Sequence, residues 1–159
     1  LLESDTCSTA TVLIRNSHLN LWGIERNALL RDAEANTPRL LSSQIRDLSS
    51  ILEESLGQAA LSLSGRLFVL TNRLRLNGAS CLLNEEVLRS FAGEQHSGFY
   101  VLPSSIHEVI LLPSEREDFC AGALQRMVEE INRTEVAETE VLSDHVYYYD
   151  RRTFMLQSL

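Results

Sequence analysis

Residues 99–112 read FYVLPSSIHEVILL. The stretch contains an apolar run at 99–102 and a largely apolar run at 107–112, on either side of a turn that begins at Pro103. Proline and serine are typical turn residues, and the aromatic and β-branched residues around them are typical of strands, so the pattern predicts a β-hairpin. A hairpin makes its two strands antiparallel neighbours, which sets the direction of the sheet.

Further strands are expected around this hairpin. A closing hairpin is predicted at 145–156, where HVYYYD and FML lie on either side of two arginines. Shorter apolar runs predict strands at 10–15, 67–71 and 79–83. Because the strands come in adjacent pairs between helices, we predict an α+β fold with an antiparallel or mixed sheet, rather than alternating βαβ units.

Apolar residues at helical spacing predict four helices, at 24–35, 43–56, 84–91 and 114–131. The first is expected to end before Pro38, since the residue that precedes a proline is disfavoured in the helical conformation. The last has the clearest apolar stripe, which includes Cys120. We expect about four helices packed mainly on one side of the sheet, in a single domain over residues 1–159.

The charged residues exclude several classes of function. The chain has 159 residues and a net charge of −8, and all 14 basic residues are arginines. The absence of lysine excludes Schiff-base chemistry, a pyridoxal phosphate lysine and a P-loop lysine. An acidic chain with no basic run longer than Arg151-Arg152 is expected to bind neither nucleic acid nor an anionic membrane. No dinucleotide motif is present, and no cofactor is expected.

The first residue and the cysteines bear on whether the chain is part of a longer protein and on its cellular compartment. The chain begins at Leu1 rather than at a methionine, so we expect it to be part of a longer protein. Cys7, Cys81 and Cys120 are too few and too far apart for a disulfide framework or a zinc site. Such cysteines are typical of reduced thiols in a cytoplasmic protein.

Several stretches resemble a known family. They read LTN and NGA at 70–72 and 77–79, LPSSIHEV at 102–109, and EVLSD and YYYD at 140–144 and 147–150. In these the chain resembles an uncharacterised family of bacterial proteins that is known only as a domain of unknown function. The resemblance implies a cytoplasmic protein and a C-terminal position for this chain within a longer one. It implies no activity.

The end of the first hairpin's turn carries two ionisable residues. On a strand at 107–112, alternation puts Glu108 on one aliphatic face and His107 on the other. In a central strand at least one of them would be enclosed, and burial raises the pKa of a carboxylate into the range of a general acid or base. Asp144 and His145 form a second pair that could add ligands for a divalent metal. The alternative is structural, with Glu108 paired to an arginine and His107 bonded to backbone.

The closing hairpin carries the main concentration of aromatic residues. Tyr147, Tyr148 and Tyr149 precede Arg151 and Arg152. Tyrosine and arginine are enriched at protein interfaces, so these five residues are candidates for a binding surface. Tyrosine also packs well within sheets, and a purely structural role is an equal alternative.

We predict a non-catalytic binding or protein-interaction module, because no complete catalytic constellation is present. Its expected partner is another protein or the upstream segment of the same protein. The alternative is a hydrolase, with or without a divalent metal, centred on His107 and Glu108 and supported by Asp144 and His145. A thiol nucleophile at Cys81 is a weaker alternative, since a cysteine between strand residues is more often a packing residue.

Overall fold

A computed structural model of the chain describes residues 12–48, 67–103, 105–114 and 120–159. The chain divides into two compact units, residues 1–37 and 38–159. The prediction of a single domain over 1–159 stays a prediction. None of the helices in the described ranges has the length and apolar character that crossing a membrane requires.

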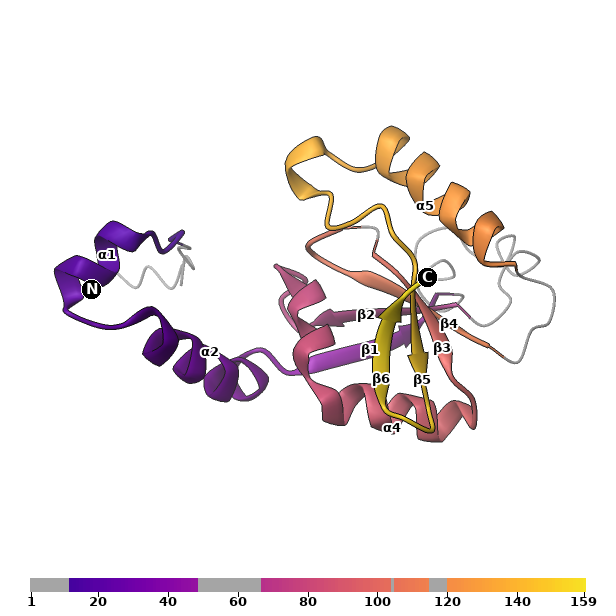
Figure 1. The fold of residues 1–159 in the computed structure, drawn as a ribbon, viewed down its shortest axis with the longest axis horizontal. Coiled ribbons are helices and arrows are strands. Elements are labelled where there is room, and N and C mark those ends of the chain that lie inside the picture. Colours follow the sequence, from indigo (N-terminus) through magenta and orange to yellow (C-terminus); the bar gives the residue numbers. More distant parts are fainter. Residues whose placement is uncertain (1–11, 49–66, 104, 115–119) are drawn as a thin grey trace, which may run out of the picture. The chain divides into compact units, whose positions relative to one another are not determined.

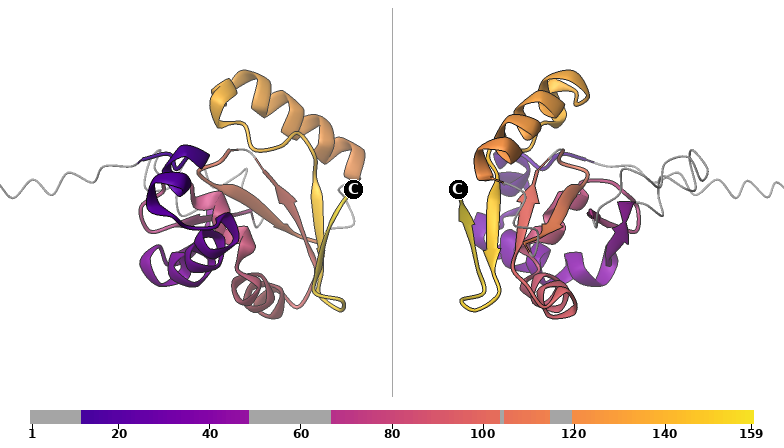
Figure 2. Two further views of the ribbon diagram at one scale, coloured as in Figure 1. Left: turned by 60° about the vertical axis from the view of Figure 1, so that its left-hand side comes forward. Right: turned by 90° about the vertical axis from the view of Figure 1, so that its right-hand side faces the viewer.

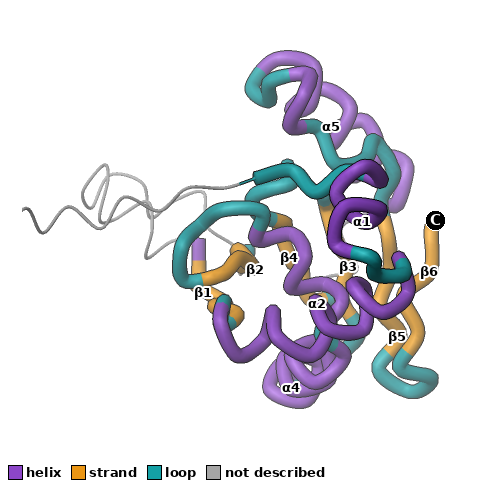
Figure 3. Tube along the Cα trace, turned by 90° about the vertical axis from the view of Figure 1, so that its left-hand side faces the viewer, coloured by secondary structure: helices purple, strands orange, loops and turns teal. Residues whose placement is uncertain are grey.

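The described residues of the first unit form helices. Helix α1 spans Asn16–Trp22 and helix α2 spans Arg26–Leu40, and a short loop joins them (Figure 3). Gly23 provides the left-handed residue that ends α1, with a φ of 65°. Neither helix contains a buried residue.

Two predictions for the segment that ends with α2 are wrong. Residues 12–15, the described part of the expected strand at 10–15, form no strand. Pro38 does not end the second helix but lies inside it, and α2 continues to Leu40. Proline has a backbone φ that suits a helix, and near the C-terminal end it removes only one hydrogen bond.

The second unit is built on a six-stranded sheet (Figure 1). Its strands are β1 Ser43–Asp47, β2 Phe68–Asn72, β3 Phe99–Leu102, β4 Val109–Pro113, β5 Tyr147–Asp150 and β6 Met155–Ser158. Their order in the sheet is β1-β2-β4-β3-β5-β6, and every neighbouring pair is antiparallel. The α+β class and the antiparallel sheet are therefore confirmed, as are both hairpins, β3–β4 and β5–β6.

Helices cover both faces of this sheet. Helix α4 spans Glu85–Gln95 and packs on one face together with the 3₁₀ helix η2, Gly78–Leu83. Helix α5, Ala121–Thr134, packs on the opposite face (Figures 1 and 2). The expectation that the helices gather mainly on one side is therefore corrected for α4 and α5. A second 3₁₀ helix, η3 at Glu138–Glu140, follows α5.

The core on the α4 face is rich in aromatic rings. Phe91 of α4 contacts Phe68 and Phe99 edge to face, and Phe99 in turn stacks on Tyr149. Helix α4 begins where the sequence predicts, because the Asn84 side chain accepts hydrogen bonds from the first backbone N–H groups of the helix. The α5 face has a smaller aliphatic core.

Three other local predictions are wrong. Residues 43–47, expected to start a helix, form β1, and the rest of that helix beyond Leu48 lies outside the described residues. The expected strand at 79–83 is part of η2. Cys120, expected in the core, is the exposed residue before the first turn of α5.

Candidate functional site

His107 and Glu108 do not lie on a strand. Strand β4 begins at Val109, so the alternation that was expected to bury one of the two residues does not apply to them. Glu108 is exposed, and the His107 side chain is 29% exposed. The premise of an enclosed carboxylate on this strand is therefore wrong.

His107 instead holds a loop in place. Its Nδ1 accepts a hydrogen bond from the Asn77 N–H at 3.0 Å, so the ring proton of the neutral form lies on Nε2. This Nε2 is 3.5 Å from Oε1 of Glu140, a residue that the sequence analysis did not single out. The His107 carbonyl accepts a hydrogen bond from the Thr71 hydroxyl at 2.8 Å. These contacts tie the loop before β4 to β2, η2 and η3.

Asp144 and His145 have other partners. The Asp144 carboxylate accepts a hydrogen bond from the Asn132 side chain at 2.9 Å, and the His145 N–H donates to the Ser143 hydroxyl at 3.1 Å. Across the described ranges, no three side chains of histidine, cysteine, aspartate or glutamate gather closely enough to hold a metal ion. The structure thus places the pair His107 and Glu108 and the pair Asp144 and His145 in separate loops, with separate hydrogen-bond partners.

Cys81 has the surroundings of a packing residue. It is buried, and its thiol donates to the Thr71 carbonyl at 3.4 Å. A buried thiol with a backbone partner fits a structural role better than that of a nucleophile.

Replacing His107 by alanine is expected to lower the free energy of unfolding by about 1 kcal/mol, because the loop loses one side-chain acceptor and the contact with Glu140. His107→Asn is expected to restore most of the loss, since its amide oxygen can accept from the Asn77 N–H. Urea denaturation measures both changes. The exposed His145 is the control, and His145→Ala is expected to change stability by less than about 0.5 kcal/mol. An unchanged stability of the His107→Ala variant would contradict the loop-holding role.

The three tyrosines of β5 are mostly packing residues. Tyr149 is 2% exposed and stacks on Phe99, so it belongs to the core and not to an exposed patch. Tyr147 is half-buried against the same core. Tyr148 lies on the other face of the sheet, where its ring packs against Tyr100. Of the five residues predicted to bind a partner, the two arginines are the exposed ones.

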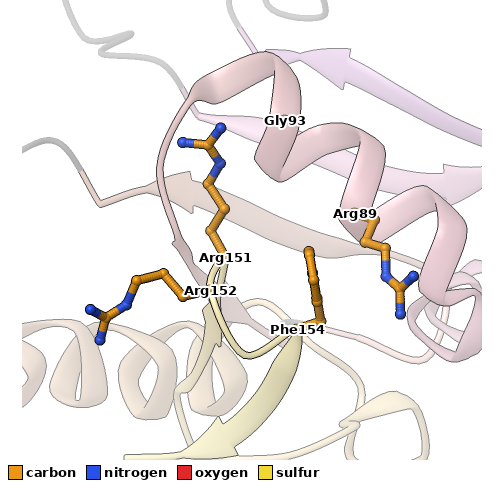
Figure 4. Close-up of a pocket in the computed structure, with 5 residues that line it drawn as sticks. All are labelled: Arg89, Gly93, Arg151, Arg152 and Phe154. Atoms are coloured by element: carbon orange, nitrogen blue, oxygen red, sulfur yellow. The ribbon is translucent and has the colours of Figure 1, made fainter.

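Arg151 and Arg152 line an open cleft of about 490 Å³ between α4 and the β5–β6 turn (Figure 4). Helix α4 contributes Arg89 and Gly93, and the turn contributes Phe154. The Arg89 guanidinium carbon lies 4.5 Å from the centre of the Phe154 ring, a cation–π arrangement. In Figure 4, Arg151 extends along α4 toward Gly93, whereas the Arg152 side chain points away from the helix.

Two of the cleft's arginines are positioned by neighbours. Arg151 donates a hydrogen bond of 2.8 Å to the His96 carbonyl at the C-terminal end of α4, where a cation is favoured. Arg89 pairs with Glu85 one helical turn earlier, at 3.4 Å. Burial raises the pKa of the Tyr149 hydroxyl, and Arg89 partly opposes this shift.

The turn itself has a defined geometry. The Asp150 carboxylate accepts a hydrogen bond of 2.7 Å from the Arg152 N–H, and this bond holds the pKa of Asp150 below its ordinary value. The Asp150 carbonyl accepts from the Phe154 N–H at 2.8 Å. Phe154 has a φ of 57°, a left-handed conformation in which glycine is the favoured residue. A phenylalanine in this conformation lowers the stability of the fold by about 1 kcal/mol relative to glycine. The ring of Phe154 therefore lines the cleft at the cost of backbone strain.

Arg89, Gly93 and Phe154 were not singled out as site residues from the sequence. The sequence offers no local signal for Arg89 and Gly93, since only the packing of α4 beside β5 brings them to the turn. Phe154 lies two residues after Arg152, at the start of the second strand predicted for the closing hairpin, and this proximity to the predicted arginines was the available signal.

Comparison with known proteins identifies a family. The model of a family of unknown function, DUF5688, matches residues 1–151. The chain belongs to this family. Searches of curated proteins and of solved structures gave no match. The resemblance to an uncharacterised family is therefore confirmed. The DUF5688 match includes α4 and Arg151 of the cleft and ends before β6, and its description assigns no activity.

Proposed function

We propose that this DUF5688 chain is a non-catalytic protein-interaction module whose cleft between α4 and the β5–β6 turn binds an acidic segment of a partner protein. The observation that carries the proposal is the lining of the cleft, which includes three arginines and an exposed phenylalanine. The chain as a whole has a net charge of −8, so three arginines in one cleft contrast with its overall acidic composition.

The chemistry of the cleft suits a carboxylate ligand. Arginine offers a planar set of donors that matches a carboxylate in a bidentate geometry. The Phe154 ring, 47% exposed, supplies an apolar surface for the carbon atoms of the same ligand. The strained backbone of Phe154 supports a functional role, because a glycine would satisfy the turn at lower cost.

The hydrolase alternative has less support. His107 accepts a hydrogen bond from Asn77 and lies beside Glu140, and Asp144 accepts a hydrogen bond from Asn132. These interactions support structural roles for both side chains. No contact in the described ranges favours a hydrolytic site over these roles.

Replacing Arg151 and Arg152 together by serine is expected to weaken binding of acidic peptides about tenfold, because two exposed charge contacts contribute together about 1.4 kcal/mol. A library of displayed random peptides, selected on the wild-type chain, supplies the probes, and fluorescence polarisation measures their affinity. The proposal expects the recovered peptides to be enriched in aspartate and glutamate, with an affinity that falls as salt concentration rises.

The matched control removes the same charge elsewhere. Arg126 and Arg133 lie exposed on α5, outside the cleft, and their joint replacement by serine is expected to leave peptide affinity unchanged. Phe154→Gly removes the backbone strain of the turn together with the aromatic ring. This variant is expected to be at least as stable as the wild type and to bind acidic peptides more weakly. Recovery of no acidic peptides, or equal losses in the cleft and α5 variants, would overturn the proposal.

A further inference from the structure

Strand β6 leaves one edge of the sheet open. It is the last strand in the sheet order, and its outer edge pairs with no other strand in the described ranges. Every residue of β6 is exposed. In Figure 2 the strand lies at the outside of the sheet, next to β5. Such an edge presents unpaired backbone N–H and C=O groups to another chain.

The two edges of the sheet differ in chemical character. β1, at the opposite edge, includes Arg46 and Asp47, and charges on an edge strand discourage pairing with other chains. Residues 153–159 read TFMLQSL and contain no charge and no proline. Met155 is 57% exposed and Leu159 is 54% exposed. The β6 edge therefore lacks the features that prevent strand addition.

The register identifies which backbone groups face outward. The Leu159 N–H donates to the Val146 carbonyl, so Leu159 faces β5. In an antiparallel pair successive residues alternate between facing the partner strand and facing away. Gln157 therefore faces β5, and the N–H and C=O groups of Leu156 and Ser158 face the open edge.

We propose that the partner's acidic segment binds as an added strand along β6. This inference rests on the proposed function and names the form in which the ligand binds. An extended peptide would pair with Leu156 and Ser158, and as it continues past Met155 it would bring its carboxylates to Arg151 and Arg152 in the turn. Side chains of the peptide on the α4 face would lie beside Leu156, which shares that face with Tyr149.

Charge complementarity favours an acidic partner over a second copy of the chain. The charged residues of segment 151–159 are Arg151 and Arg152. Strand β6 itself has no charged side chain, so two β6 edges paired with each other would supply no carboxylate to the arginines of the adjoining turns. An acidic segment supplies the missing charge.

Ser158→Pro tests the added strand, because it removes an outward N–H without removing a hydrogen bond to β5. The peptide that binds the wild-type chain most tightly is the probe. Its affinity for the Ser158→Pro variant is expected to fall about tenfold. Ser158→Ala is the matched control, since it removes the hydroxyl and keeps the N–H, and its affinity is expected to equal that of the wild type.

Amide hydrogen exchange in the wild-type chain tests the same point without a substitution. Addition of the peptide is expected to slow exchange at Leu156 and Ser158, and to leave Gln157 unchanged because it already faces β5. This measurement keeps the proposal falsifiable if the proline variant loses β6 altogether.

The outcomes separate this inference from the proposed function. If peptide binding depends on Arg151 and Arg152, but the Leu156 and Ser158 amides are unaffected, the cleft binds its ligand without strand addition and only the inference is overturned. If no acidic peptide binds, the proposed function is overturned as well. A dimer in sedimentation equilibrium that Ser158→Pro dissociates would identify a second copy as the occupant and overturn the inference.

Discussion

Replacing Gly78 by alanine is expected to lower the free energy of unfolding by about 3 kcal/mol, at the upper end of what overpacking usually costs. A Cβ atom at this position would overlap the Thr71 hydroxyl, the His107 carbonyl oxygen and the Asn72 backbone nitrogen. Two of these three are backbone atoms of elements held by hydrogen bonds, and they cannot rotate away. The loop before β4 would have to move off η2.

Gly93→Ala is the matched control for this prediction. Gly93 lies in α4, and a Cβ atom there would meet no neighbour within 4 Å. Alanine in a helix is favoured over glycine, so this variant is expected to gain about 1 kcal/mol. Urea denaturation measures both variants against the wild type. A Gly78→Ala variant as stable as the wild type would show that the loop does not pack as closely as the structure places it.

The role of Gly78 was only partly predictable. Asn77-Gly78 indicates a turn, and Asn77 does adopt a left-handed φ of 51°. Gly78, however, has no positive φ and begins η2. Its lack of a side chain serves the close approach of β2 and the loop at His107, which are separate segments. Sequence alone shows that a glycine is present, but not which segments approach it.

The two hairpins and α4 were predicted because their signals are local. Alternation, turn residues and the Asn84 cap all lie within a few positions of the elements they define. β1 was missed because the apolar residues Ile45, Leu48, Leu52 and Leu56 have helical spacing across 43–56. The backbone groups of residues 43–47 nevertheless pair with β2 along the whole strand. Helical propensity is a weak preference that tertiary pairing overrides.

The candidate catalytic pair shows the same limit. The alternation of residues 107–112 predicts a strand that starts at His107, and periodicity alone does not show that it starts only at Val109. Hydrogen bonds from Ala79 N–H to the Ile106 carbonyl, and from Ile106 N–H to the Glu140 carbonyl, join the backbone of this loop to η2 and η3. These hydrogen bonds join segments that are distant in the sequence, so the local pattern of residues does not predict them. The shift of the strand start to Val109 is enough to remove Glu108 from the buried face.

The cleft was half predictable for a related reason. Arg151 and Arg152 were identified as candidates because they adjoin the tyrosines, and both line the cleft. The neighbouring tyrosines, which suggested a binding surface, are mostly packing residues instead, since Tyr149 lies in the core. The α4 residues of the cleft depend on how α4 packs, which is decided by the aromatic core.

Replacing Phe91 by alanine is therefore expected to have the largest effect of any single change, a loss of about 4 kcal/mol in the free energy of unfolding. Phe91 is 1% exposed, and its ring centre lies 5.0 Å from those of both Phe68 and Phe99. The ring joins α4 to strands β2 and β3 at once. Its removal leaves a cavity that the surrounding strands, fixed by their ladders, cannot close.

Phe91→Leu tests how much of the effect comes from the aromatic contacts of Phe91 and how much from the volume of its side chain. Leucine retains much of the volume but not the edge-to-face contacts, so this variant is expected to lose about 1.5 kcal/mol and to keep α4 in place. Thermal and urea unfolding measure both variants, and peptide affinity reports on the cleft. Because Arg89 and Gly93 reach the turn only through the packing of α4, the leucine variant should bind acidic peptides like the wild type. A Phe91→Ala loss below about 1.5 kcal/mol would mean that α4 is held by other contacts, and the cleft would then need a different structural basis.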